Sequence, residues 1–278
     1  MNKFINQFTI ITGAASGIGY ALAEKALQLS MRVFLLDIDE AKLKKTVLEF
    51  SQRYQKTIDS AVLDVTKREQ VFNTAKNILA KHGAPDLLIN NAGSGGPIGP
   101  IWEVDFSAIQ QCISLNLESL IHMTQAFLPA MIERNTKAYI VNNSSLAGFY
   151  SAPLLSAYEM AKHAAVAFTE ALHHDLKNRN LPIQIALLAP GWVNTGIIQN
   201  ANVDTENLTE SEWKWMLQFA KRVRRGCSPA EVANIVFQGL SENCFYIFTD
   251  ELLAKQIIQT RNQALLNQTA PPAFDLEK

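Results

Sequence analysis

The chain has 278 residues, of which 48% are apolar and 18% charged, so it can bury a sizeable core and does not have the composition of a disordered protein. Its formal net charge of −1 gives no overall attraction to nucleic acid or to an anionic membrane, and neither is expected as a partner. The three cysteines lie far apart and form no CxxC pair, which predicts a reducing compartment and a cytoplasmic protein.

Short apolar runs alternate along the chain with longer stretches of helical spacing. In chain order, the pattern predicts a strand at Phe8–Thr12, a helix at Gly17–Ser30, a strand at Arg32–Leu36, a helix at Glu40–Tyr54, a strand at Ser60–Leu63, a helix at Glu69–Lys81, a strand at Asp86–Asn90, a long helix at Phe106–Arg134 distorted near Pro129, a strand at Ala138–Asn142, a helix at Leu155–Asn178, a strand at Ile183–Leu188 and a seventh strand at Cys244–Phe248.

This alternation of buried strands and helices predicts an α/β fold, a Rossmann-type doubly wound parallel sheet of about seven strands with helices on both faces. We expect one domain over residues 1–278. Residues 191–226 interrupt the alternation and contain several aromatic side chains, so we interpret them as a lid over the substrate. Residues 269–278 are expected to form a loosely ordered tail.

The first predicted strand runs directly into a turn rich in glycine, Thr12-Gly-Ala-Ala-Ser-Gly-Ile-Gly19. Glycines allow the sharp turn and the close approach of a phosphate, and the helix that follows points its free N–H groups at the phosphate. The spacing is GxxxGxG, so the generic GxGxxG fingerprint is met only approximately. The cofactor-binding residues assigned to this turn are Thr12, Gly13, Ser16, Gly17, Ile18 and Gly19.

Asp37 ends the second predicted strand. A carboxylate there can accept hydrogen bonds from the adenosine ribose hydroxyls and would repel a 2′-phosphate, which favours NAD over NADP. We find no cation beside it in the sequence. The histidines near the last long helix, His163, His173 and His174, have no carboxylate or cysteine pattern beside them, so no metal site is expected.

Several further motifs follow in a fixed order: Asp64-Val65, Asn90-Asn-Ala-Gly93, Asn116, Ser145, Tyr158-Glu-Met-Ala-Lys162 and Pro190-Gly-Trp-Val-Asn-Thr195. Together with the glycine turn they resemble the short-chain dehydrogenase/reductase family over residues 12–195. The resemblance implies a Rossmann-type domain, a bound NAD(P) and a homotetramer or homodimer. It adds these cofactor-binding residues: Asp64, Val65, Asn91, Ala92, Gly93, Tyr158, Lys162, Pro190, Gly191, Val193 and Thr195.

Tyr158 and Lys162 are four residues apart in a helical pattern and project from one face. A free phenol has a pKa of about 10, and an ammonium about 4 Å away could lower it by up to about three units, bringing it into working range as a general acid or base. The resemblance implies that Lys162 also binds the nicotinamide ribose, that Ser145 donates to the substrate oxygen and that Asn116 holds a water. Ser144 competes with Ser145, and the interval of 13 residues to Tyr158 favours Ser145.

The sequence therefore predicts an oxidoreductase that transfers a hydride between NAD(H) and a small-molecule substrate, a secondary alcohol or ketone. The aromatic side chains of the predicted lid indicate that this substrate is hydrophobic. Two alternatives remain open. The first is an NADP-linked carbonyl reductase, which needs a cation for the 2′-phosphate. The second is a scaffold or sensor that binds NAD without turnover, for which a tuned phenol serves no purpose.

Overall fold

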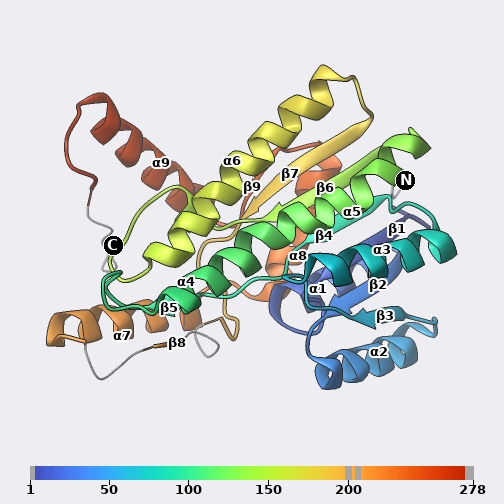
Figure 1. The fold of residues 1–278 in the computed structure, drawn as a ribbon, viewed down its shortest axis with the longest axis horizontal. Helices are drawn as coiled ribbons and strands as arrows, with labels where there is room; N and C mark the ends of the chain where they lie inside the picture. The colour runs from blue at the N-terminus through green and yellow to red at the C-terminus, as the bar shows by residue number, and fades with distance from the viewer. Residues whose placement is uncertain (1–3, 198–201, 204–207, 273–278) are drawn as a thin grey trace.

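The computed structural model describes residues 4–197, 202–203 and 208–272 (Figure 1). Its main sheet has seven parallel strands in the order β3-β2-β1-β4-β6-β7-β9. Their bounds are β1 Phe8–Thr12, β2 Arg32–Asp37, β3 Asp59–Val62, β4 Leu87–Asn90, β6 Ala138–Asn143, β7 Ile183–Ala189 and β9 Tyr246–Phe248. The order runs outward from β1 in both directions, which confirms the predicted doubly wound sheet.

Helices cover both faces of this sheet (Figure 1). Their bounds are α1 Gly17–Gln28, α2 Glu40–Tyr54, α3 Arg68–His82, α4 Phe106–Ile113, α5 Ser119–Arg134, α6 Ser156–Asn178, α7 Glu210–Arg225, α8 Pro229–Glu242 and α9 Glu251–Leu266. Buried side chains of α1, α2 and α8 form the core on one face, and those of α3, α5 and α6 form the core on the other. Adjacent strand residues such as Ile10 and Ile11 belong to opposite cores, as the two-residue period of a strand requires.

The long predicted helix is interrupted near its middle. A π turn at Ser114–Glu118 separates α4 from α5, and α5 continues through Pro129 without a break. Proline removes one backbone hydrogen bond, here to the carbonyl of Gln125, and both residues lie on the exposed side of the helix, where water can satisfy that carbonyl. The helix thus tolerates Pro129, as expected, whereas the irregularity around Asn116 was not predicted.

The region predicted as a lid contains regular structure. β8 (Asn202–Val203) pairs with β5 (Pro97–Ile98) in a small second sheet, and α7 begins with a capping box between Thr209 and Glu212. The last helix, α9, was not predicted, because its polar and apolar residues show no clear helical stripe. Most of the tail predicted at 269–278 lies outside the described residues.

Candidate active site

A cavity of about 1430 Å³ lies at the carboxyl ends of the strands, where the strand order reverses between β1 and β4. Of the site residues predicted from the sequence, all but Thr12 and Gly19 line it. They come from segments far apart in the chain that the parallel sheet brings to one edge. The two exceptions lie beneath the surface of the cavity and shape it.

Backbone geometry explains the glycines of the first turn. Gly13 and Gly17 have φ of +64° and +53°, a left-handed conformation that glycine adopts without strain. A Cβ on Gly19 would lie 2.0 Å from the carbonyl oxygen of Gly13, so only glycine lets α1 start this close to the turn. The result is an open turn at a helix N-terminus, which fits the phosphates of a dinucleotide.

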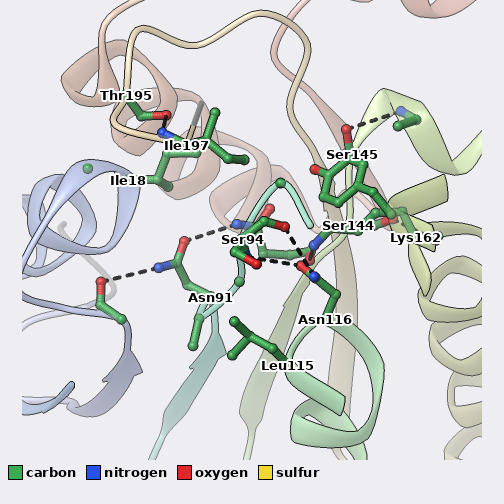
Figure 2. Close-up of a pocket in the computed structure, with 18 of the residues that line it drawn as sticks. Ile18, Asn91, Ser94, Leu115, Asn116, Ser144, Ser145, Lys162, Thr195 and Ile197 are labelled. Atoms are coloured by element: carbon green, nitrogen blue, oxygen red, sulfur yellow. Dashed lines mark hydrogen bonds between the residues drawn. The ribbon is translucent and has the colours of Figure 1, made fainter. Parts of the chain in front are cut away.

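Thr12 supports this turn from below. Its hydroxyl accepts hydrogen bonds from the backbone N–H groups of Asn91 (2.9 Å) and Ala92 (3.0 Å), and the Asn91 side chain donates to the carbonyl of Thr12 at 3.0 Å. Asn143 at the end of β6 then donates to the Asn91 side chain at 3.0 Å. The ends of β1, β4 and β6 are thus held together by side chains, with Asn91 at the centre (Figure 2).

Asp37 lies at the end of β2 and faces the cavity. Its two carboxylate oxygens accept hydrogen bonds from the backbone N–H groups of Ala15 and Asp39, both at 2.9 Å, which fixes the carboxylate beside the glycine turn. Lys42 also lines the cavity here and pairs with Asp39 at 2.8 Å. The expectation that no cation lies near Asp37 was wrong, because the first turn of α2 brings Lys42 back to the strand end.

The neighbouring part of the wall comes from the segment after β3. Asp64 and Val65 line the cavity, and Asp64 accepts hydrogen bonds from the backbone N–H (3.0 Å) and the hydroxyl (2.6 Å) of Thr66. Across the cavity, Thr195 lies over the glycine turn, with its Cγ2 3.5 Å from where a Cβ of Gly17 would be. These contacts enclose the cavity between the turn and the segment that follows β7.

The four predicted catalytic side chains meet at the other end of the cavity, and Figure 2 labels three of them, Asn116, Ser145 and Lys162. The Lys162 amine lies 5.5 Å from the centroid of the Tyr158 ring and donates to the carbonyl of Asn143 at 3.0 Å. Ser144 also lines the cavity, but its hydroxyl donates to the carbonyl of Lys162 at 2.9 Å and so anchors α6, while Ser145 is hydrogen-bonded to Tyr158. This arrangement supports Ser145 over Ser144.

The pKa of Tyr158 differs from the expected direction. Burial raises it to about 12, and the hydrogen bond with Ser145 only partly opposes this rise. The pKa of Lys162 is lowered to about 8, because the ammonium is buried as well. The predicted lowering of the Tyr158 pKa by Lys162 was therefore wrong for the protein alone, since the amine lies over the ring and desolvation dominates.

Asn116 lies in the π turn and is almost fully buried. Its amide donates to the carbonyls of Cys112 (3.0 Å) and Ser94 (3.1 Å), and its side-chain oxygen accepts from the backbone N–H of Ser94 at 3.3 Å. A Cβ on Gly93 would lie 2.8 Å from that oxygen. Asn116 thus fixes the loop after β4 against the helix, directly beside Lys162 (Figure 2).

The substrate end of the cavity contains apolar side chains that the sequence analysis partly missed. Trp192 and Phe219 of the predicted lid line it, with ring centroids 5.3 Å apart. Leu253 and Ile257 of α9 also line it and would have been found only if α9 had been recognised. Val223 of the predicted lid also lines it, and further apolar lining residues outside the prediction include Ile98, Phe106, Leu146, Tyr150 and Leu155.

One buried ionisable group next to Tyr158 in the sequence was also missed. Glu159 is only 5% exposed and accepts a hydrogen bond from the backbone N–H of Ala152 at 2.7 Å. Burial raises its pKa to about 7. Among the residues that the structure describes, no three His, Cys, Asp or Glu side chains gather as a metal site would require, and no helix is long and apolar enough to cross a membrane.

Comparison with known proteins supports the assignment that this geometry suggests. Residues 7–206 match the family described as short chain dehydrogenase. The CLA biosynthesis dehydrogenase/reductase of Lactiplantibacillus plantarum is 33% identical over 98% of this chain and 97% of its own. Estradiol 17-beta-dehydrogenase 11 of Macaca fascicularis is 28% identical over 97% of this chain and 85% of its own.

A solved structure is similar over nearly the whole length. The short-chain dehydrogenase/reductase from Burkholderia phymatum in complex with NAD is 32% identical, covers 99% of both chains and has a TM-score of 0.90. An alcohol dehydrogenase from Thermococcus sibiricus, complexed with 5-hydroxy-NADP, shares the fold at 21% identity over 87% of this chain and 95% of its own, with a TM-score of 0.72. With the family match over 7–206 and the site described above, the chain belongs to the short-chain dehydrogenase/reductase family of oxidoreductases that use a pyridine nucleotide.

Proposed function

We propose that this enzyme interconverts a hydrophobic secondary alcohol and its ketone with NAD(H) as the cofactor. The observation that carries the proposal is the meeting of Ser145, Tyr158 and Lys162 at the apolar end of a cavity whose other end is a glycine turn with a carboxylate beside it. A binding protein without turnover has no need of such a triad, so the scaffold alternative explains less of the site.

The cofactor would lie along the cavity from Asp37 to Lys162. The glycine turn would take its phosphates, Asp37 its adenosine ribose, and Lys162 its second ribose. The other contacts that we assign to it are those of Asp64, Val65, Asn91, Ala92, Gly93, Pro190, Gly191, Val193 and Thr195, all of which line the cavity. When bound, a pyridine nucleotide supplies or accepts the hydride and, in its oxidised form, adds a positive charge that favours a phenolate.

The chain's own residues would then move the proton. In reduction, the neutral Tyr158 hydroxyl donates its proton to the substrate oxygen, and Ser145 donates a hydrogen bond to the same oxygen as negative charge develops on it. In oxidation, the Tyr158 oxygen takes the proton from the alcohol. Since the pKa of Tyr158 is about 12 in the protein alone, the resting site favours donation, and oxidation should accelerate as the pH rises.

The preference for NAD rests on local charge. Asp37 and Asp39 outnumber Lys42 at the adenosine end of the cavity, so the net charge there is negative and disfavours a 2′-phosphate. Lys42 is the side chain that favours the NADP-linked alternative, but its salt bridge to Asp39 leaves it less able to bind a phosphate. The Burkholderia phymatum enzyme, whose structure contains NAD, is in line with the proposal.

The substrate class follows from the apolar wall. Aliphatic and aromatic side chains from four parts of the chain surround the space in front of Tyr158, and Trp192 with Phe219 belongs to the segment 191–226 that we interpret as the lid. A molecule that fills this space would bury mainly hydrocarbon. The relatives named for CLA biosynthesis and for estradiol are in keeping with such a substrate.

We further propose a homo-oligomer in the cytoplasm. The outer side of α6 carries Met160, Ala164, Ala167, Phe168 and Ala171, which are partly or fully exposed and uncharged. A second copy of the chain would cover such a surface. All three cysteines are free, as suits a reducing compartment.

The direct test of the reaction is Tyr158→Phe. We expect turnover of a ketone panel, followed by NADH absorbance, to fall about 10²–10⁴-fold, because the proton donor is lost. NAD affinity, measured by fluorescence quenching, should stay within about twofold, since the ring and Lys162 remain. Tyr150→Phe removes another hydroxyl from the same cavity and should cost far less. Activity retained in Tyr158→Phe would refute the proposed role.

A further inference from the structure

Exposed apolar side chains gather beside the substrate end of the cavity. Trp102 is 81% exposed and Phe106 is 67% exposed, and Phe106 also lines the cavity, so this segment forms part of its mouth. Trp213 and Leu217, at 40% and 52% exposure, lie on the outer side of α7. Large apolar side chains in such numbers at one opening indicate a contact surface.

The loop before α4 and the helix α7 are held together beneath this surface. Trp215, Met216 and Phe219 on the inner side of α7 pack against Ile98 and Leu155, next to the loop. The backbone N–H of Gly99 donates to the carbonyl of Leu154 at 3.0 Å, which fixes the start of the loop. Figure 1 shows the loop that leads into α4 lying over α7, on the side of the molecule away from α2. The two segments that carry the exposed residues are thus neighbours at the same end of the molecule.

The same helix is basic. From Trp213 to Arg225 it has five cations and no acidic residue: Lys214, Lys221, Arg222, Arg224 and Arg225. All but Arg222 are exposed on the outer side, together with Trp213 and Leu217. Lys214 pairs with Glu210 at 2.6 Å, and the exposed acids near Trp102 are Glu103 and Asp105. The sequence of α7 has no acidic residue within one turn of Arg224 or Arg225.

We propose that this face, made of Trp102, Phe106 and the outer side of α7, docks onto an anionic lipid surface and places the cavity mouth against it. Aromatic and leucine side chains beside lysines and arginines are the composition of helices that lie in a membrane interface. The proposal concerns surface docking, for which the overall charge of −1 is a poor guide, because the cations are concentrated at one place.

A lipid surface explains the face better than a second copy of the chain does. A two-fold contact centred on α7 would bring its cations against the same cations of the partner copy, which repel. The outer side of α6 from Met160 to Ala171, which is uncharged, suits a second copy far better. Docking would also let a hydrophobic substrate enter the cavity directly from the lipid in which it dissolves. This second role rests on the proposed function, whereas the docking itself does not.

The test is sedimentation of the full-length protein with vesicles of phosphatidylcholine alone or mixed with phosphatidylglycerol, at low and high salt. We expect binding to the anionic vesicles only, weakened at high salt. Trp102→Ser and the double substitution Lys221→Glu with Arg225→Glu should each reduce that binding about tenfold or more. Matched substitutions on α2, Leu48→Ser and Lys45→Glu, should leave it unchanged, because that helix lies far from the face (Figure 1).

The outcomes separate docking from catalysis. Vesicle binding needs no turnover, and the reduction rate of a small water-soluble ketone should be the same in Trp102→Ser as in the unmodified enzyme. Equal binding to neutral and anionic vesicles, no binding to either, or binding that the face variants leave unchanged would overturn the proposal. Burial of Trp102 by self-association would also overturn the proposal. It would be seen as a concentration-dependent blue shift of tryptophan fluorescence in the absence of vesicles.

Discussion

Tyr158 and Lys162 are both buried in the site, and burial disfavours the charged form of each. The pKa of Tyr158 is about 12 and that of Lys162 about 8, so at neutral pH the phenol is protonated and the amine is largely charged. A neutral phenol hydrogen-bonded to Ser145 is a ready proton donor. The same burial that suits reduction makes the free enzyme a weak base for oxidation.

Glu159 provides the clearest pH dependence. Because its pKa is raised from 4.5 to about 7 in the folded state, the unfolded chain releases the proton first as the pH increases from about 4.5 to about 7. The free energy of unfolding should therefore fall across that window, by up to about 3 kcal/mol. Glu159→Gln, which keeps an acceptor for the Ala152 N–H, should match the unmodified protein at pH 4.5 and exceed its stability at pH 8.

Urea unfolding at the two pH values measures this difference. Glu133→Gln, an exposed carboxylate on α5, is the control and should show no such pH-dependent gain. Equal stability of the Glu159→Gln variant and the unmodified protein at pH 8 would mean that the buried carboxylate is not destabilised by its surroundings.

The cofactor preference is also a property of one side chain. Asp37→Ala should weaken NAD binding about tenfold or more and reduce the discrimination against NADP, because it removes both a hydrogen-bond acceptor and a negative charge. Asp37→Asn keeps an oxygen acceptor and removes only the charge, so it should retain more of the NAD affinity. Michaelis constants for both cofactors measure the effect, and an unchanged preference in both variants would exclude a ribose contact by Asp37.

At the scale of elements, the strand–turn–helix unit from β1 to α1 depends on a close backbone approach. Gly19 lies in the first turn of α1, and the carbonyl of Gly13 occupies the position that a Cβ atom on residue 19 would need. The turn and the helix must separate if any side chain is added there. Nothing comparable surrounds Gly83 at the end of α3, where φ is +78° but no atom lies within 4 Å of a Cβ.

Alanine substitutions at these two glycines distinguish the cost of a steric clash, at Gly19, from the cost of backbone strain, at Gly83. Gly19→Ala should abolish detectable NAD binding and destabilise the fold by several kcal/mol, since backbone atoms have to move. Gly83→Ala should cost about 1–3 kcal/mol through backbone strain alone and leave NAD affinity unchanged, because φ of +78° with ψ of −176° is a conformation that other residues rarely adopt. Calorimetric titration and thermal unfolding measure both, and normal NAD affinity in Gly19→Ala would show that the turn tolerates the displacement.

At the scale of the whole molecule, two of its surfaces differ in chemistry. The outer side of α6 is apolar and uncharged from Met160 to Ala171, and the face around α7 is apolar and basic. We assign the first to a second copy of the chain and the second to a lipid surface, which are compatible because they lie on different helices.

Ala167→Glu tests the first assignment. A charge in the centre of the α6 surface should convert the oligomer to a monomer, because the buried carboxylate would have no partner. Light scattering after size exclusion measures the mass. Ala80→Glu places the same change on the exposed side of α3 and should leave the mass unchanged. An unmodified protein that is already monomeric would contradict the proposed oligomer.

Local patterns were sufficient to predict the sheet, the glycine turn and the order of the site residues. β1 and α2 have the predicted bounds, because the apolar run of a buried strand and the periodicity of a helix can both be recognised from residues close together in the sequence. Most of the predicted site residues line one cavity, since the carboxyl ends of parallel strands always meet at the same edge. No local pattern predicted that α9 lines the cavity, that Lys42 lies near Asp37 or that Glu159 is buried.

The remaining properties arise only when segments distant in the chain come together. Four residues of spacing placed Tyr158 and Lys162 on one helical face, but the direction of their pKa changes depends on how much water the surrounding elements exclude. In the same way, Leu253 lines the cavity only because α9 packs beside it. Periodicity and motif spacing are encoded along the chain, whereas desolvation and the shape of a cavity are set by which elements pack around it.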